Sequence, residues 1–113
     1  MKQLKELLYK TGIEKIIGNT DIPICNISFD SRKINNESLF IAVNGISVDG
    51  HSFIESVVQS GVRAVVCESI PDHVKQGITY VKVKDSREAL AYIASNFYDN
   101  FIVSVNEGKT SIF

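Results

Sequence analysis

The chain has 113 residues, of which 44% are hydrophobic and 22% charged, and this is enough for one folded domain with a single core. The formal net charge is −1 and the basic residues are scattered, so we expect no binding to nucleic acid or to an anionic membrane. There is no apolar run of membrane-spanning length and no signal-peptide pattern, which favours a cytoplasmic protein. Cys25 and Cys67 have no partner at metal-ligand spacing, so we expect two buried free thiols and no metal site.

The first part of the chain is predicted to form two helical stretches and then two strands. Leucines at helical spacing predict a helix over residues 2–10, and three isoleucines predict another turn or two over residues 13–17. Residues 24–29 contain no strong breaker and suit a strand. Residues 39–43 are uniformly apolar, which is typical of a strand covered on both faces. A loop over residues 44–50 follows.

The rest of the chain alternates between helical and extended patterns. The predicted elements are a helix from His51 that ends at Gly61, a strand over 62–67, a short helix opened by Pro71, a strand over 78–83, a helix capped by Asp85 or Ser86 with Leu90, Ile93, Ala94 and Phe97 as its buried stripe, and a strand over 101–105. This alternation predicts an α/β layered domain with a mixed, largely parallel sheet flanked by helices. The strand–loop–strand order near residue 30 favours the mixed sheet over a purely parallel one.

The tripeptide Asp30-Ser31-Arg32 follows the first predicted strand and suits a phosphate. A hydroxyl and free backbone amides can donate hydrogen bonds there, and arginine adds charge-assisted ones. The structural alternative is also open, because Asp-Ser is common turn chemistry and Asp30 can pair with Arg32.

The second polar stretch is the glycine-containing loop over residues 44–50 together with the start of the next helix. Asp49 or Ser52 can cap that helix, and a helix N-terminus attracts anions. Capping for stability alone remains the alternative. His51 has no serine and aspartate in triad order, so we expect no catalytic residue in the chain.

The order of these motifs resembles the opening domain of MurE-type enzymes in the Mur ligase family. The matching stretches span roughly residues 20–100 and are residues 29–33, 39–45, 49–54, 64–68, 83–90 and 96–98. The resemblance implies a fold like the N-terminal domain of MurE and MurF over residues 1–100. It also implies a role in holding the uridine diphosphate (UDP) end of UDP-N-acetylmuramoyl-dipeptide.

The resemblance also carries a set of site residues to this chain. Phe29 and Ser31 are implied to contact UDP, and Ile46, Ser47 and Val48 to line the nucleotide pocket, with secondary roles for Arg32, Asp49, Gly50 and His51. Many relatives have histidine and glutamine near positions 46 and 47. Isoleucine and serine offer less side-chain hydrogen bonding there, so backbone contacts must contribute more.

The tail over residues 101–113 is expected to be a remnant of the start of the family's central ATP-binding domain. Its P-loop match is confined to Gly108, Lys109, Thr110 and Ser111. The first half of the motif fails, since Val105 stands where the family has glycine. The resemblance implies that the full ligase uses ATP and Mg²⁺, whereas this chain alone is expected to hold neither and to be inactive.

Three roles fit these patterns. The first is a UDP-substrate-binding module, and the second is a non-catalytic interaction or regulatory paralogue that kept the fold and lost the ligand. The third is a fragment that associates with central and C-terminal ligase domains on another chain.

Overall fold

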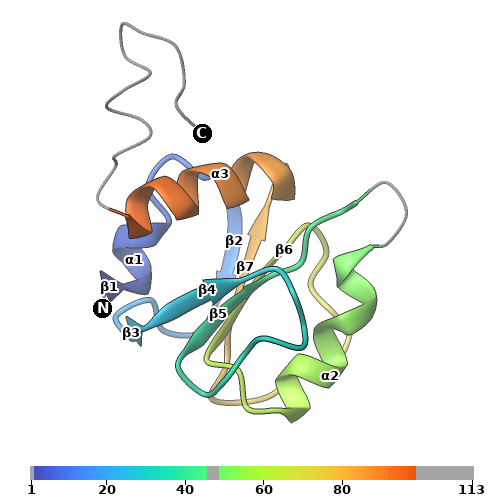
Figure 1. Ribbon diagram of the computed structural model, residues 1–113. Coiled ribbons are helices and arrows are strands. Elements are labelled where there is room, and N and C mark those ends of the chain that lie inside the picture. Colours follow the sequence, from blue (N-terminus) through green and yellow to red (C-terminus); the bar gives the residue numbers. More distant parts are fainter. Residues whose placement is uncertain (1, 46–48, 99–113) are drawn as a thin grey trace, which may run out of the picture.

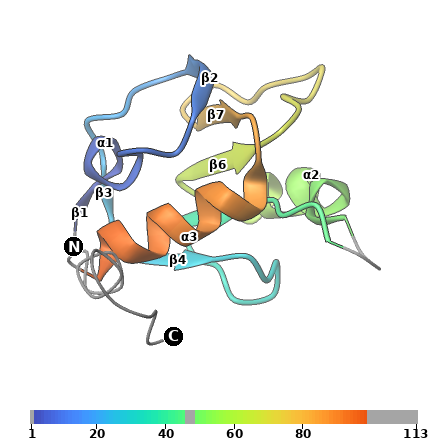
Figure 2. The ribbon, with the colours of Figure 1, turned by 90° about the horizontal axis from the view of Figure 1, so that it is seen from above.

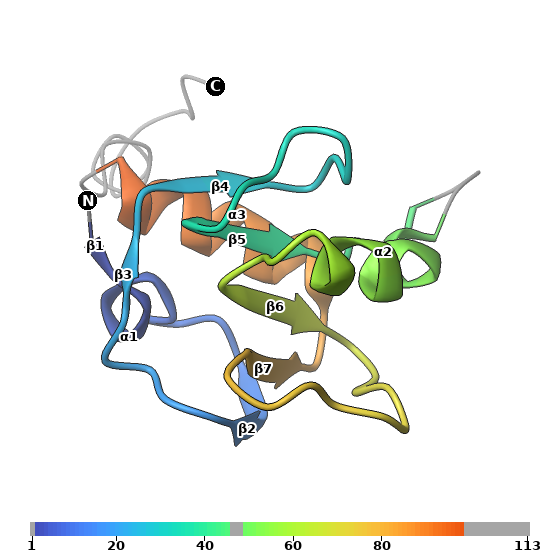
Figure 3. The ribbon, with the colours of Figure 1, turned by 90° about the horizontal axis from the view of Figure 1, so that it is seen from below.

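The computed structural model describes residues 2–45 and 49–98, and a five-stranded sheet lies at their centre. The strands lie in the order β2-β7-β6-β5-β4, which Figure 3 shows from one edge to the other. Their bounds are β2 Ile13–Ile17, β4 Asn26–Ser28, β5 Ser38–Ile41, β6 Ala64–Cys67 and β7 Thr79–Val83. Strands β4 to β7 are parallel to one another, and β2 pairs antiparallel with β7.

The mixed, largely parallel sheet is therefore confirmed, but the expected reason for it is wrong. The strands around residue 30, β4 and β5, are parallel. The antiparallel pair comes from residues 13–17, where we expected helical turns. A register shift between Ile13 and Lys15 interrupts the pairing with β7. Such a bulge breaks the in-out alternation by which a strand is recognised in sequence.

Helices cover both faces of the sheet, so the domain has three layers (Figures 1 and 2). Helices α1 Leu4–Leu7 and α3 Ser86–Phe97 cover one face, and α2 Ile54–Gln59 covers the other. Successive β5 residues alternate between the two cores: Leu39 packs with α1 and α3, and Phe40 packs with α2. The uniformly apolar β5 is therefore buried on both faces, as its sequence predicts.

Helix α3 begins at Asp85, whose carboxylate accepts the backbone N–H groups of Arg87 and Glu88. This is ordinary N-cap geometry. From the predicted stripe, Ile93 is fully buried, while Leu90, Ala94 and Phe97 are half-buried. The other end of α3 is tied to α1.

That tie is made by Asn96, which is 5% exposed. Its amide nitrogen donates to the backbone oxygens of Leu7 and Tyr9 at 3.0 and 2.9 Å. Leu7 ends α1 and Tyr9 follows it, so the asparagine pairs with carbonyls that have no partner within the helix.

Several predicted elements differ from the structure. The helix over 2–10 is reduced to α1, preceded by β1 Lys2–Gln3, which pairs with β3 Pro23–Ile24. The strand over 24–29 is split at Cys25 into β3 and β4, which belong to different sheets. Cys25 is consequently exposed rather than buried, whereas Cys67 is buried and both thiols are free.

The short helix at Pro71 is also wrong, since residues 71–77 form bends and a turn. Most of them are exposed, so a helix there would have no apolar face to bury. The strand predicted over 101–105 lies outside the described residues. Among the described residues, no helix is long and apolar enough to cross a bilayer.

Candidate functional site

The polar segments singled out in the sequence leave the sheet at its carboxyl edge. Strands β4 and β5 are neighbours and run in parallel, so the turn after Ser28 and the loop that begins after Ile41 start at the same edge (Figure 1). Open α/β sheets bind ligands at this edge. The structure thus brings the two predicted segments to one side of the fold.

The turn after β4 is held by its own side chains. Ser28 Oγ accepts the backbone N–H of Asp30 and donates to the Asp30 carbonyl, both at 3.0 Å. The Asp30 carboxylate accepts from the backbone N–H of Arg32 at 2.9 Å and from its Nε and Nη2 at 3.0 Å. These bonds lower the pKa of Asp30 to about 2. The guanidinium of Arg32 is therefore already paired with Asp30, which is the structural alternative that the sequence left open.

Phe29 and Ser31 flank Asp30 and differ in exposure. Phe29 is 63% exposed, which leaves a ring face open to a planar group, and Ser31 is half-buried. Phe29 and Asp30 also line a pocket of about 340 Å³ with Leu90, Ala94 and Tyr98 of α3 and its C-terminus. This pocket is the more apolar part of the site.

The second segment is described only at its stems, because Ile46, Ser47 and Val48 lie outside the described residues. Asn44 and Asp49 form an isolated antiparallel bridge that closes the loop. The next residue, Gly50, donates its N–H to the Val43 carbonyl at 2.8 Å. A Cβ at Gly50 would lie 2.7 Å from the Val43 nitrogen, so no side chain fits there. Close packing against the backbone of Val43 therefore explains why position 50 is a glycine.

His51 uses both ring nitrogens for hydrogen bonds within the protein. Its Nε2 accepts the backbone N–H of Glu68 at 2.7 Å, so its proton must be on Nδ1, which lies 2.7 Å from Asp49 Oδ1. The same Asp49 carboxylate caps the 3-10 helix η1 Gly50–Phe53 by accepting the backbone N–H of His51. The two bonds from His51 lower the pKa of Asp49. His51 is thereby a structural bridge between Asp49 and the end of β6.

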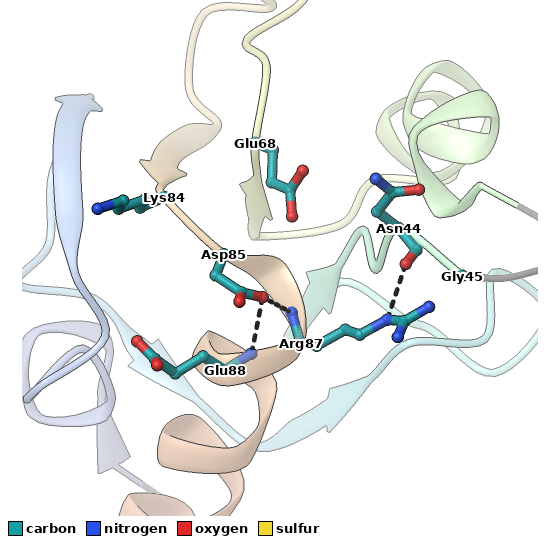
Figure 4. Close-up of a pocket in the computed structure, with 7 residues that line it drawn as sticks. All are labelled: Asn44, Gly45, Glu68, Lys84, Asp85, Arg87 and Glu88. Atoms are coloured by element: carbon teal, nitrogen blue, oxygen red, sulfur yellow. Dashed lines mark hydrogen bonds between the residues drawn. The ribbon is translucent and has the colours of Figure 1, made fainter.

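A polar cluster beside this loop was missed by the sequence analysis. Glu68, directly after β6, accepts the N–H and the hydroxyl of Ser86 through Oε2, both at 2.8 Å. Ser86 Oγ accepts the backbone N–H of Asn44 at 3.0 Å. Arg87 Nε donates to the Asn44 carbonyl at 3.0 Å (Figure 4). The signal available in the sequence was position alone: an acidic residue after a buried strand and a serine at a helix start.

The N-terminus of α3 is consequently already filled by carboxylates. Glu68 takes the N–H of Ser86, and Asp85 takes those of Arg87 and Glu88. A phosphate would meet negative charge there, so the usual helix N-terminal anion site is closed. Beside it lies a pocket of about 640 Å³, lined by Asn44, Gly45, Glu68, Lys84, Asp85, Arg87 and Glu88 (Figure 4).

The fold and this edge define a small α/β domain with a polar site built from strand ends. Residues 23–98 match the family described as "Mur ligase family, catalytic domain". The P-loop-like residues Gly108, Lys109, Thr110 and Ser111 lie outside that match and outside the described residues. The chain belongs to the Mur ligase family.

Similar proteins agree with this membership. The chain is 52% identical over 99 residues to a "UDP-N-acetylmuramoyl-L-alanyl-D-glutamate--2,6-diaminopimelate ligase" of Cytophaga hutchinsonii, with 87% of this chain and 20% of that protein covered. It is 40% identical to the ligase of the same name from Bacteroides fragilis, with 97% and 24% covered. This chain thus spans about a fifth to a quarter of these relatives.

Solved structures show the same fold. A crystal structure of MurF from Acinetobacter baumannii superposes with a TM-score of 0.68 and 26% identity, over 86% of this chain and 21% of that one. MurF from Thermotoga maritima, solved in complex with ADP, gives a TM-score of 0.56 over 67% of this chain. The predicted likeness to the N-terminal domain of these ligases is confirmed.

Proposed function

We propose that this chain is the UDP-binding domain of a MurE-type ligase in peptidoglycan precursor synthesis. In this role it holds the UDP end of UDP-N-acetylmuramoyl-dipeptide and does not catalyse ligation by itself. The similarity to UDP-N-acetylmuramoyl-L-alanyl-D-glutamate--2,6-diaminopimelate ligases supports this substrate class, and it points to 2,6-diaminopimelate as the amino acid added by the whole ligase. Coverage of about a fifth of those proteins fits one domain of several.

The observation that carries the proposal is the shared edge. Because the turn at Ser31 and the stem at Asn44 follow neighbouring parallel strands, one extended ligand can touch both. The exposed ring of Phe29 offers a stacking face for uracil, and the Ser31 hydroxyl offers a donor to a phosphate oxygen. Ile46, Ser47 and Val48 are proposed to complete the nucleotide pocket with their backbone.

The secondary residues have different parts in this proposal. Arg32 contributes positive charge near the diphosphate, although part of its guanidinium is held by Asp30. Asp49, Gly50 and His51 shape the loop stem and need not touch the ligand. ATP and Mg²⁺ belong to the proposed whole ligase, in which this domain would associate with central and C-terminal domains.

Calorimetric titration tests the proposal. UDP is expected to bind weakly and saturably, and uridine without phosphates more weakly still. Ser31→Ala should reduce the affinity roughly tenfold to a hundredfold, since a hydrogen bond to a charged group contributes about 1.5–3 kcal/mol. Ser60→Ala, at the exposed end of α2, serves as the control and should bind as the wild type does.

The opposite result would favour the regulatory alternative. Suppose that UDP gives no heat of binding at millimolar concentration and that the chain forms a stable homodimer. The protein would then have kept the fold and lost the ability to bind UDP. Restored ATP-dependent ligation on addition of a chain that supplies the missing domains would instead support association in trans.

A further inference from the structure

Both stems of the loop over residues 44–50 are tied to one residue, Glu68. On one side its carboxylate holds Ser86, whose hydroxyl oxygen accepts the N–H of Asn44. On the other side its backbone N–H is held by His51, whose second ring nitrogen contacts Asp49. Asn44 and Asp49 are themselves bridged. Glu68, at the end of β6, thus anchors Asn44 and Asp49, the two stems of the loop.

The direction of the first connection is fixed by chemistry. A serine hydroxyl has a single proton, and the Ser86 hydroxyl donates it in a hydrogen bond to a carboxylate oxygen of Glu68 at 2.8 Å. The hydroxyl oxygen is then oriented to accept the Asn44 N–H at 3.0 Å. Ser86 is fully buried, so water does not compete for these bonds. Without the acceptor on Glu68, the hydroxyl is free to rotate and the loop stem loses its defined partner.

We propose that Glu68 is a positioning residue for Asn44 and Asp49, the two stems of the loop over residues 44–50: it holds them through Ser86 and His51 without touching the ligand. This inference rests on the proposed function. The position also gives Glu68 a second effect on specificity. Because its carboxylate accepts the first N–H of α3, it keeps phosphates away from that helix terminus and leaves the turn after β4 as their site.

The test compares Glu68→Ala and Glu68→Gln in the full 113-residue chain. The glutamine carbonyl can still accept both bonds from Ser86, so Glu68→Gln should keep the Asn44 amide protected from hydrogen exchange and retain UDP affinity within about threefold. Glu68→Ala should lose that protection and weaken UDP binding about tenfold or more. The control is Glu55→Ala on α2, an exposed carboxylate with no hydrogen bond to the rest of the described residues. It should match the wild type in both readouts.

The outcomes separate this inference from the proposed function. If wild-type protein binds no UDP, the proposed function fails, while Asn44 exchange and the ¹⁵N shifts of the His51 ring still report on positioning. A folded Glu68→Ala protein with unchanged Asn44 protection overturns the inference. If Glu68→Ala does not fold, Ser86→Ala removes only the hydroxyl: loss of Asn44 protection supports the relay, and retained protection contradicts it.

Discussion

The ring of His51 lies 2.7 Å from the backbone nitrogen of Glu68 and joins the start of η1 to the end of β6. His51→Phe keeps a ring of similar size but removes this acceptor, which leaves the N–H of Glu68 unpaired. We expect the free energy of unfolding to fall by about 1–3 kcal/mol. Urea denaturation measures this change. His73→Phe, at an exposed position, is the control, and equal losses in the two variants would contradict the bridging role.

The pair of Asp30 and Arg32 predicts a pH dependence at the β4 turn. The pKa of Asp30 is lowered from 3.8 to about 2, first of all by its side-chain bond to Arg32. Because the pKa is lower in the folded state, the ionised carboxylate stabilises the fold at pH values above the pKa of the unfolded chain. This contribution disappears as the pH falls toward 2. The carboxyl ¹³C shift of Asp30 should therefore titrate near pH 2. In Arg32→Ala the midpoint should rise toward 3.8, and an unchanged midpoint would show that the arginine is not the cause.

Gly50 predicts a steric limit at the loop stem. An alanine Cβ would lie 2.7 Å from Val43 N and 3.0 Å from Val43 O, which are backbone atoms of the chain that leaves β5. Gly50→Ala should therefore lower the free energy of unfolding by about 1–3 kcal/mol and also weaken UDP binding, since the stem must move. Thermal denaturation and titration report the two effects. Gln59→Ala at an exposed α2 position should show neither effect, and a wild-type result for Gly50→Ala would refute the close approach.

The two cysteines should react very differently. Burial raises the pKa of the Cys67 thiol to about 11, so little thiolate forms at neutral pH, and the residue is inaccessible in any case. Cys25 is exposed between β3 and β4. Iodoacetamide at pH 8 should modify Cys25 in the native protein and Cys67 only in urea, as read by peptide mass spectrometry. Equal labelling of both in the native state would contradict this burial.

The sequence predicted the parts of the fold that depend on local pattern. Helix α3 with its Asp85 cap and the buried strand β5 carry clear periodicity and capping signals, and both are where they were expected. Strand β2 was misread because its bulge against β7 breaks the alternation that marks a strand. The split at Cys25 depends on which sheet each half joins, and this is decided by long-range pairing.

The candidate site was predictable to a similar extent. The turn Asp30-Ser31-Arg32 and the loop stem Asp49-Gly50-His51 are contiguous motifs, and the topology places them at one edge. The bonds among Asn44, Glu68 and Ser86 join residues 18 and 42 positions apart. No local pattern encodes such contacts, because they arise only after β5, β6 and α3 are assembled. Ligand contacts by Phe29, Ser31 and residues 46–48 stay predictions.

The most direct test of the account is an amide NMR titration of this chain with UDP. We expect saturable shifts that cluster at Ser31 and over residues 44–50, the segments that follow β4 and β5. Shifts confined to the opposite edge, around Gly18 and Arg63, or no shift at millimolar UDP, would contradict a nucleotide site at the carboxyl edge.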